Sequence, residues 1–542
     1  GAGKAAKVAA PNTSAWRAFA TGALIESNSG HVSLLAARNM SIANDTTTDR
    51  TFESFYQVKR RLFSRRVTTE LRTSVDETVQ PTVISGRSVS LAAGGQLDLV
   101  ASSVLTAGAG GLHADGDLNL LSAAEHDLAY SARTVRKSGI FGNGGLSITI
   151  GNRSSTSIQE SEQLLQHGAS VGSLAGDILA TAGGQYLQLS SDLTAPQGDV
   201  HISAQNVALR TAPNTTSVMN LVRQRQSGIT LSASHPVVQA LQTVDEMTKL
   251  AKRTDNGRYQ ALGLMTAGLT IYNAYRDPNL LGNPDPKTGA GWGGGSISAS
   301  VGASQSLFEN VTKTTTPAAS AIEAGRNVTI TATGTGADSG DITAIGARIS
   351  APGHITLNAV RDITLAAAIG SNSETTRKRS SSASVGLSYG GGGQQAGLAF
   401  NLAVSRSNGW SNGWGTTYYN TELASGGTLS LSSGRHLTLN GAKASGLRLV
   451  ARVGTSGAGD LTIASPIDQS HYIARESSAG INVSIPIPGM GVGIPSLGLS
   501  AGQLNLLAQY EAVRQQSVLS AGVDAWTDTI VSSLVELTQC TG

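Results

Sequence analysis

The chain has 542 residues, among them 65 glycines, and only 4% of its residues are aromatic. Charged residues make up 14%, the formal net charge is +3, and there is one cysteine, Cys540. This composition excludes an intramolecular disulfide framework and gives no electrostatic case for binding nucleic acid. Because few bulky aromatic side chains are available for a globular core, it favours a fold that stacks small aliphatic residues.

The N-terminal residues contain no apolar run long enough for a signal peptide. No stretch of about 18 strongly apolar residues predicts a membrane-spanning helix. Because the sequence begins in the middle of a repeating pattern, we expect a piece of a longer protein.

A short phrase recurs along the chain, and the stretch 339–365 shows it three times. A turn pair such as Gly340-Asp341 precedes a few residues in which aliphatic and polar side chains alternate, and alternation places the two kinds on opposite faces of a strand. Similar phrases start at Gly30, Arg38, Gly86, Gly95, Gly116, Gly176, Gly198, Gly325, Gly427, Gly434 and Gly459. Repetition every ~20 residues predicts an all-β solenoid, a parallel β-helix, with a β-sandwich as the alternative.

Five regions follow from this pattern in chain order. Residues 1–234 and 296–520 are predicted as repeat coils with β-hairpin insertions. Residues 235–277 have apolar residues at helical spacing and predict a helical hairpin insertion. Residues 278–295 form a Pro/Gly loop, and residues 521–542 a divergent, weakly helical tail.

The insertions predicted as hairpins are 49–79, 130–166, 371–420 and 476–509, and residues 296–316 are hairpin-like by themselves. Their aliphatic residues alternate with small polar ones, which leaves two interpretations. The apolar faces either enter a target membrane as strands, or pack against the solenoid or the helices. The alternating residues include Val385, Leu387, Tyr389, Leu398, Phe400, Leu402, Val404, Ile481, Val483, Ile485 and Ile487.

The first hairpin carries a basic cluster, whose members are Lys59, Arg60, Arg61, Arg65 and Arg66. One interpretation is a site for polyanions such as glycan sulfates or lipopolysaccharide phosphates. The other is a solvated hairpin, because Glu53, Glu70, Asp76 and Glu77 dilute the positive charge.

No motif predicts catalysis, a cofactor or a metal site. The G-x-S-x-G matches at 168–172 and 386–390 lack the helix that a nucleophile elbow requires. Among the nine histidines, His113 lies near Asp115 and His126 between Glu125 and Asp127, but neither has a second His or a Cys at ligand spacing. We therefore expect a chain without enzymatic activity, and keep a polysaccharide lyase or hydrolase only as a weak third alternative, because a fold supplies no active site.

The repeated phrase, together with the interruptions at 136–145, 223–231 and 380–386 and the helical passage 238–275, resembles filamentous hemagglutinin and the contact-dependent growth inhibition effectors. The resemblance covers roughly residues 25–520 and is closest to the distal repeat region of those proteins; the tail departs from it.

The resemblance implies a Gram-negative exoprotein that is exported through a dedicated outer-membrane transporter and displayed at the cell surface. Its function would be contact-dependent toxin delivery to neighbouring cells through the target-cell envelope. The alternative is an adhesin segment that binds a host glycan or protein. The repeat region of the family offers no catalytic residues to carry over.

Overall fold

A computed structural model describes residues 6–8, 18–144, 147–234, 296–336, 338–392, 395–493, 495–512 and 517–529. The predicted helical hairpin at 235–277 and the loop at 278–295 lie outside these ranges. Every regular element within them is a β-strand. No helix in this part of the chain is long and apolar enough to cross a membrane.

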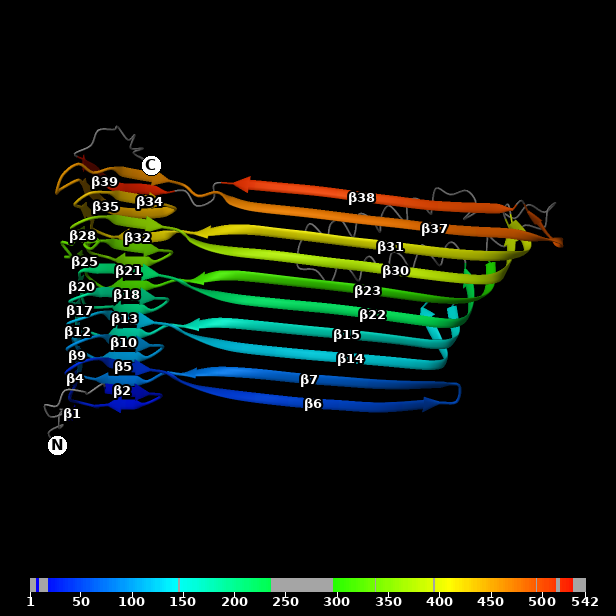
Figure 1. Ribbon diagram of the computed structural model, residues 1–542, viewed down its shortest axis with the longest axis horizontal. Helices are drawn as coiled ribbons and strands as arrows, with labels where there is room; N and C mark the ends of the chain where they lie inside the picture. Colours follow the sequence, from blue (N-terminus) through cyan, green and yellow to red (C-terminus); the bar gives the residue numbers. More distant parts are fainter. Residues whose placement is uncertain are drawn as a thin grey trace.

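Short parallel strands stack into a solenoid with three faces, which confirms the predicted β-helix (Figure 1). Each face is a ladder in which a strand pairs with its counterparts in the coils below and above; Leu118, for example, pairs with Leu97 and with Tyr186. Ladders 1 and 2 belong to one 19-stranded sheet, joined through β35 and β39, and ladder 3 is a separate 10-stranded sheet.

The bounds of the strands are as follows. Ladder 1 holds β3 (Leu24–Glu26), β8 (Val83–Gly86), β11 (Ser103–Thr106), β16 (Ser170–Ser173), β19 (Asp192–Ala195), β24 (Ala321–Ala324), β27 (Arg348–Ala351), β32 (Thr421–Ser425), β35 (Ala442–Val453) and β39 (Val518–Thr529). Ladder 2 holds β1 (Ala6–Val8), β4 (His31–Ala36), β9 (Ser88–Ala93), β12 (Gly110–Ala114), β17 (Ile178–Ala182), β20 (Val200–Ala204), β25 (Val328–Ala332), β28 (Ile355–Ala359) and β33 (Thr428–Ser433), and then shares β35 and β39. Ladder 3 holds β2 (Ala18–Thr21), β5 (Met40–Ala43), β10 (Leu97–Val100), β13 (Leu118–Leu121), β18 (Gln185–Leu189), β21 (Asn206–Arg210), β26 (Ile342–Ile345), β29 (Ile363–Ala366), β34 (Leu437–Asn440) and β36 (Leu461–Ala464).

The core of the solenoid is made of the aliphatic residues of the repeated phrase. Ile355, Leu357, Ile363 and Leu365 are all 0% exposed, as their alternation with threonine predicts. Each stacks on the same position of the neighbouring coils, and Ile363 lies between Ile342 and its counterpart in the next coil. A narrow interior of this kind holds aliphatic side chains one layer deep, which explains the low aromatic content.

The aspartate of the Gly-Asp phrase links successive coils. The backbone N–H of Asp199 donates to Oδ1 of Asp177 at 2.8 Å, and the N–H of Asn327 donates to Oδ1 of Asp199 at 2.9 Å. The same contact recurs later, where His436 N–H donates to Asp362 Oδ1 at 3.0 Å. The hydrogen bond from Asp199 lowers the pKa of Asp177. At the turns, these carboxylates accept hydrogen bonds from backbone N–H groups that the hydrogen bonds of the ladders do not satisfy.

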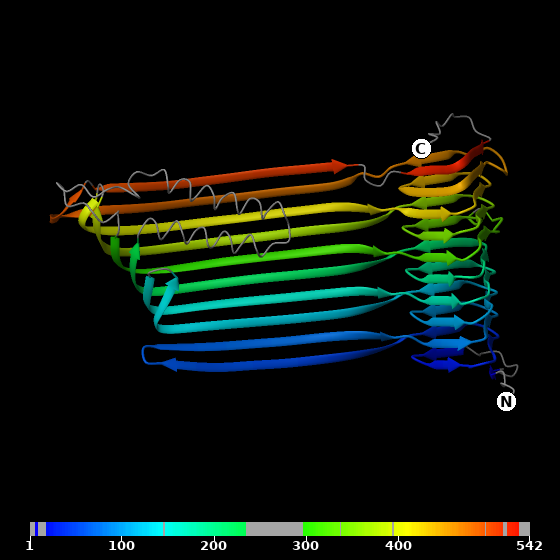
Figure 2. The same cartoon turned by 180° about the vertical axis from the view of Figure 1, so that it is seen from behind.

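Ten long strands leave the solenoid and form a third sheet, which we call the hairpin sheet (Figure 2). It is antiparallel, and its strands stand in the order of the sequence, so that each hairpin lies beside the next one. Its strands are β6 (Asp45–Arg61), β7 (Ser64–Gln80), β14 (Ala123–Gly144), β15 (Ser147–His167), β22 (Ala212–Ser234), β23 (Ser296–Ala318), β30 (Ala368–Gly392), β31 (Gln395–Tyr419), β37 (Asp468–Gly493) and β38 (Ser496–Ala512).

The hairpins join into one sheet because their spacing matches the rise of the solenoid. Each hairpin leaves after a ladder 3 strand and returns to a ladder 1 strand, and two complete coils separate one return from the next exit. Two coils advance the stack by about 10 Å, which is also the width of a two-stranded hairpin. Neighbouring hairpins therefore meet at hydrogen-bonding distance, as β15 and β22 do over their length.

A buried hydroxyl group stabilises most of the places where a hairpin returns. Thr82 Oγ1 donates to Ala43 O at 2.5 Å, and Thr421 Oγ1 donates to Ala366 O at 2.6 Å. The accepting carbonyl belongs to the last residue of the ladder 3 strand that precedes the hairpin, where the chain turns away from its ladder. Ser320 and Ser517 make the equivalent bonds to Arg210 O and Ala464 O at 2.7 and 2.5 Å. The sequence signal is a Ser or Thr shortly after four of the five hairpins, which the repeat analysis did not use.

Three expectations are corrected. Residues 296–316 are not a hairpin by themselves: they lie in β23, which pairs with β22 across the intervening segment, and local alternation cannot show so distant a partner. The tail does not begin as a helix, because β39 continues to Thr529 and pairs with β35. The apolar faces of the hairpins do not pack on the solenoid, because the hairpin sheet extends away from it (Figure 1).

Candidate functional site: the two faces of the hairpin sheet

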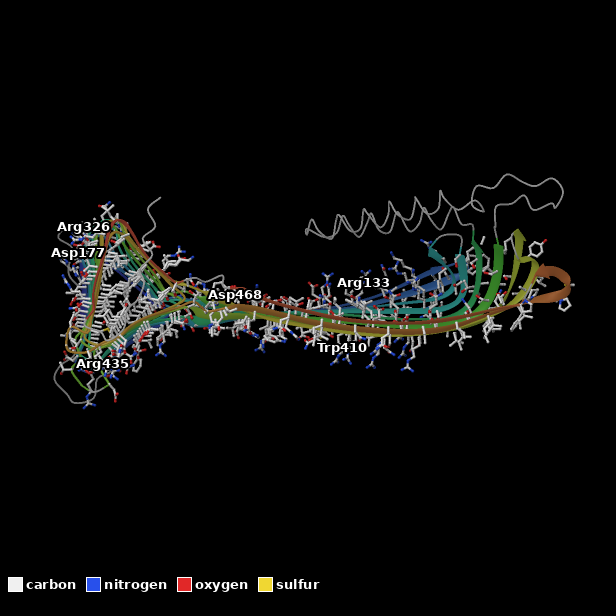
Figure 3. All side chains as sticks on the ribbon, turned by 90° about the horizontal axis from the view of Figure 1, so that it is seen from above. Arg133, Asp177, Arg326, Trp410, Arg435 and Asp468 are labelled. Carbon is white, nitrogen blue, oxygen red and sulfur yellow. The ribbon has the colours of Figure 1, made fainter. Side chains whose placement is uncertain are left out.

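Strand register assigns every side chain of the hairpin sheet to one of two faces. Directly paired residues share a face, and consecutive residues alternate between faces. Arg133 and Trp410 mark the two faces, and Figure 3 shows them on opposite sides of the sheet. The ends of the strands far from the solenoid curve toward the Arg133 side. We call that side the concave face and the Trp410 side the convex face.

A row of glycines crosses the sheet where this curvature begins. Gly139 pairs with Gly151, Gly151 with Gly228 and Gly228 with Gly302. The backbone of Gly139 has φ +99°, and a Cβ atom on Gly151 would lie 2.1 Å from the carbonyl oxygen of Ser227. Only glycine allows adjacent backbones to approach so closely, so this row permits the bend.

Beyond the glycine row, the convex face is an exposed apolar surface, which we call the apolar zone. Its side chains stand in rows across the strands, and single members such as Val301 and Leu497 are 54% and 65% exposed. Contiguous exposed apolar surface of this extent marks an interaction site in most proteins. The two central rows are Ile140, Ile150, Ile229, Val301, Val385, Leu402, Val483 and Leu497, and Ile148, Leu231, Ala299, Leu387, Phe400 and Ile485.

The concave face opposite the apolar zone carries mostly polar side chains, with the buried Phe141 as an apolar exception. Thr149 and Thr230 make a hydrogen bond of 2.8 Å between their hydroxyl groups, and Ser232 and Ser298 make one of 2.7 Å. The alternation of the sequence therefore produces a sheet with one apolar face and one hydroxyl-lined face. The sequence analysis recognised the alternating stretches, and the register shows that they all fall on the same face.

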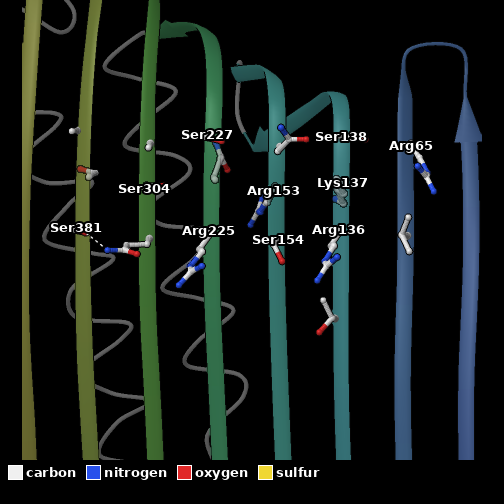
Figure 4. A pocket seen from close by; sticks show the side chains of 18 of the residues that line it. Arg65, Arg136, Lys137, Ser138, Arg153, Ser154, Arg225, Ser227, Ser304 and Ser381 are labelled. Carbon is white, nitrogen blue, oxygen red and sulfur yellow. Dashed lines mark hydrogen bonds between the residues drawn. The ribbon is translucent and has the colours of Figure 1, made fainter.

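A trough of 1190 Å³ separates the apolar zone from the solenoid-side half of the convex face (Figure 4). Exposed arginines from several hairpins line it: Arg65, Arg136, Arg225 and Arg406. Within the described ranges, none of these four guanidinium groups forms an ion pair or a hydrogen bond. Only Arg65 belongs to the predicted basic cluster; the other three arginines come from other hairpins and are far apart in the chain.

The predicted basic cluster lies at the tip of the β6–β7 hairpin, and all five side chains are exposed. They do not form one patch. Lys59 pairs with Arg66 on the concave face, together with Arg61, whereas Arg60 pairs with Arg65 on the convex face. Two residues that are adjacent in a strand point to opposite faces, so a run of basic letters overstates the local charge density.

The other motifs considered in the sequence lie in ordinary strands. Ser170 begins β16 and Ser388 lies in β30, and neither is followed by a helix. His113 contacts Asp115 at 3.0 Å and His126 contacts Glu162 at 2.9 Å. Within the ranges given above, no three His, Cys, Asp or Glu side chains gather in a way that would hold a metal ion.

The hemagglutinin repeat family matches residues 301–481. This match includes ladders, hairpins and the junctions between them. Residues 301–481 are therefore hemagglutinin repeats. The chain is 30% identical over 495 residues to "Toxin CdiA" of Escherichia coli, covering 90% of this chain and 15% of that protein.

Other relatives carry the same family name with different activities. "tRNA nuclease CdiA" of Yersinia mollaretii is 29% identical over 91% of this chain and 16% of its own length. "Deoxyribonuclease CdiA" of Yersinia pseudotuberculosis is 30% identical over 79% of this chain and 39% of its own length. The chain thus spans a minor part of each relative. No solved structure matches it.

Proposed function

We propose that this chain is a structural, non-enzymatic segment of a large secreted exoprotein at the surface of a Gram-negative bacterium, and that it acts in contact-dependent toxin delivery to neighbouring cells. Export through an outer-membrane transporter of the two-partner type is part of this proposal. The similarity to CdiA proteins supports it, since it extends over 90% of the chain. Relatives that are named for a tRNA nuclease and a deoxyribonuclease share this region, which fits a common delivery segment.

The observation that carries the proposal is the apolar zone. It lies at the end of the sheet far from the solenoid, four hairpins contribute to it, and its side chains remain exposed. We assign it to contact with the lipid of the target-cell envelope. The exposed arginines Arg136, Arg225 and Arg406 border the zone, where they would lie beside anionic headgroups while the apolar rows face the acyl chains.

A fluorescence experiment tests this assignment. Cys540 is replaced, and single cysteines carrying an environment-sensitive fluorophore are placed at Leu398 and Leu402, which flank Phe400 on the convex face. Contact with target membranes should shift their emission to that of a hydrocarbon environment. A cysteine at Asn401, on the concave face, is the matched control and should report a polar environment throughout.

Emission from water or packed protein at both convex positions, with target membranes present, would rule out lipid contact by the apolar zone. A segment of an adhesin that binds a host glycan or protein remains the alternative function. A small immunity gene directly downstream of the full coding sequence is expected for delivery and not for adhesion. None of the relatives cited above is named an adhesin.

A further inference from the structure

A row of four basic side chains crosses the concave face of the first two hairpins. Lys59 on β6 pairs with Arg66 on β7, Arg66 pairs with Lys137 on β14, and Lys137 pairs with Arg153 on β15. Neighbouring strands lie about 4.8 Å apart, so the row places one positive charge at each step across the sheet. Only its first two members belong to the basic cluster seen in the sequence; Lys137 and Arg153 come from the second hairpin.

This arrangement is electrostatically unfavourable by itself, because like charges directly opposite one another in a sheet are destabilising. In the described part of the chain, no carboxylate forms an ion pair with any of the four. Among the described residues, the row makes one side-chain hydrogen bond, a long one in which Arg153 donates to the side-chain oxygen of Gln224 at 3.5 Å. Lys137 and Arg153 are moreover only partly exposed, which weakens the screening of their charges by water.

The row continues as uncharged polar side chains. Arg153 pairs with Gln226 on β22, which pairs with Ser304 on β23, which pairs with Ser382 on β30. A cavity of 180 Å³ begins at Arg153 and follows these residues as far as Ser405 on β31. The concave face therefore offers a continuous track, with guanidinium and ammonium donors at one end and amide and hydroxyl groups at the other.

We propose that this track binds a linear glycan that carries phosphate or sulfate groups. The four cations would pair with the anionic groups, and Gln226 and the serines would hydrogen-bond to sugar hydroxyls. The glycan would lie across the strands, because the binding groups repeat in that direction. This site lies on the face opposite the apolar zone and does not depend on whether the apolar zone contacts lipid.

The structure provides a matched pair of variants for the test. One protein carries Arg66→Gln, Lys137→Gln and Arg153→Gln, all on the concave face. The control carries Arg65→Gln, Arg136→Gln and Arg225→Gln, which are exposed on the convex face at neighbouring positions. Both lose three positive charges, so net charge alone does not distinguish them. Binding to immobilised heparin, inorganic polyphosphate and neutral dextran is measured over a range of salt concentrations.

We expect the concave-face variant to bind heparin about tenfold more weakly, or worse, since charge-assisted hydrogen bonds are lost. The convex-face variant should keep most of the affinity, and the affinity of the unmodified protein should fall with salt. Heparin binding without polyphosphate binding would show that sugar contacts contribute. Equal losses in the two variants, or no loss in the concave-face variant, would overturn the proposal. Circular dichroism of both variants checks that they are folded.

Discussion

The solenoid and the hairpin sheet share the same alternating sequence pattern, but the apolar face that it produces is buried in the solenoid and exposed in the hairpin sheet. In the solenoid, three ladders face one another, so Leu357 is 0% exposed. In the hairpin sheet, the equivalent residue Leu231 is 45% exposed, because nothing described here faces the convex side. The pattern of alternation thus determines which residues share a face, whereas the connections between strands determine whether that face becomes a core.

The largest effect is expected from a charge placed in the core. Ile363→Asp removes a buried aliphatic side chain that stabilises the fold by roughly 1.5–3 kcal/mol, and it adds an unpaired carboxylate whose burial costs more. The neighbouring coils should unfold, with a large fall in the melting temperature followed by circular dichroism.

An aspartate placed on the exposed face of the hairpin sheet is the control for the aspartate placed in the core. Leu402→Asp should leave the melting profile of the solenoid unchanged, because Leu402 is already 39% exposed. Unaltered melting of the Ile363→Asp protein would refute the inward orientation of the third ladder.

An intermediate effect is expected at the junction between the two regions. Thr421→Val removes the hydroxyl that donates to Ala366 O at 2.6 Å and leaves this carbonyl without that donor. The loss should cost about 1–3 kcal/mol of unfolding free energy, the usual penalty for an unsatisfied buried group. Urea denaturation measures it, and Thr364→Val, on the outer face of ladder 3, serves as the control. Equal denaturation midpoints for the two variants would contradict a stabilising role for the junction hydroxyl.

The smallest effect concerns pH and the Gly-Asp turns. The pKa of Asp177 is lowered in the folded protein by the hydrogen bond from the backbone of Asp199 and by Arg326. Its contribution to stability is therefore present above the unfolded pKa of about 3.9 and is lost as the pH falls through the folded pKa.

Asp177→Asn should reduce the difference between the urea midpoints measured at pH 7 and at pH 3. Because the Asp177 side chain is 48% exposed, the change should be small. An unchanged difference would mean that the turn carboxylate contributes nothing that depends on its charge.

The solenoid and most of the hairpins could be predicted from the sequence, because the turns and alternating residues that indicate them lie close together in the chain. The turn at Gly340-Asp341 and the alternating residues after it lie within a few positions of one another. Sequence reasoning failed for β22 and β23, because these paired strands are separated by a long segment. It also missed that β39 continues the ladder, since the apolar residues near Trp526 fit helical spacing as well as they fit a strand.

The candidate sites depend on contacts that no local pattern contains. Arg66 and Lys137 are distant in sequence, and only the register of β7 against β14 makes them neighbours. The basic run at 59–66 was predicted as one cluster because its residues are close in sequence, but the alternation of side chains along the strands divides it between the two faces of the sheet. A two-residue alternation rule applied to that run would have predicted the division; the partners from other hairpins required the fold.

Two coils rise by the same distance as one hairpin is wide, and this match determines how many residues such a chain can gain or lose at once. Removing a single coil would bring successive hairpins about 5 Å closer together, which leaves room for one strand where two are needed. One hairpin would then be expelled from the sheet, and the rows of side chains that cross it would be interrupted. Gene duplications and deletions that preserve this architecture should therefore comprise two coils and one hairpin together, so that each inherited module lengthens the solenoid and widens both faces of the hairpin sheet in a single step.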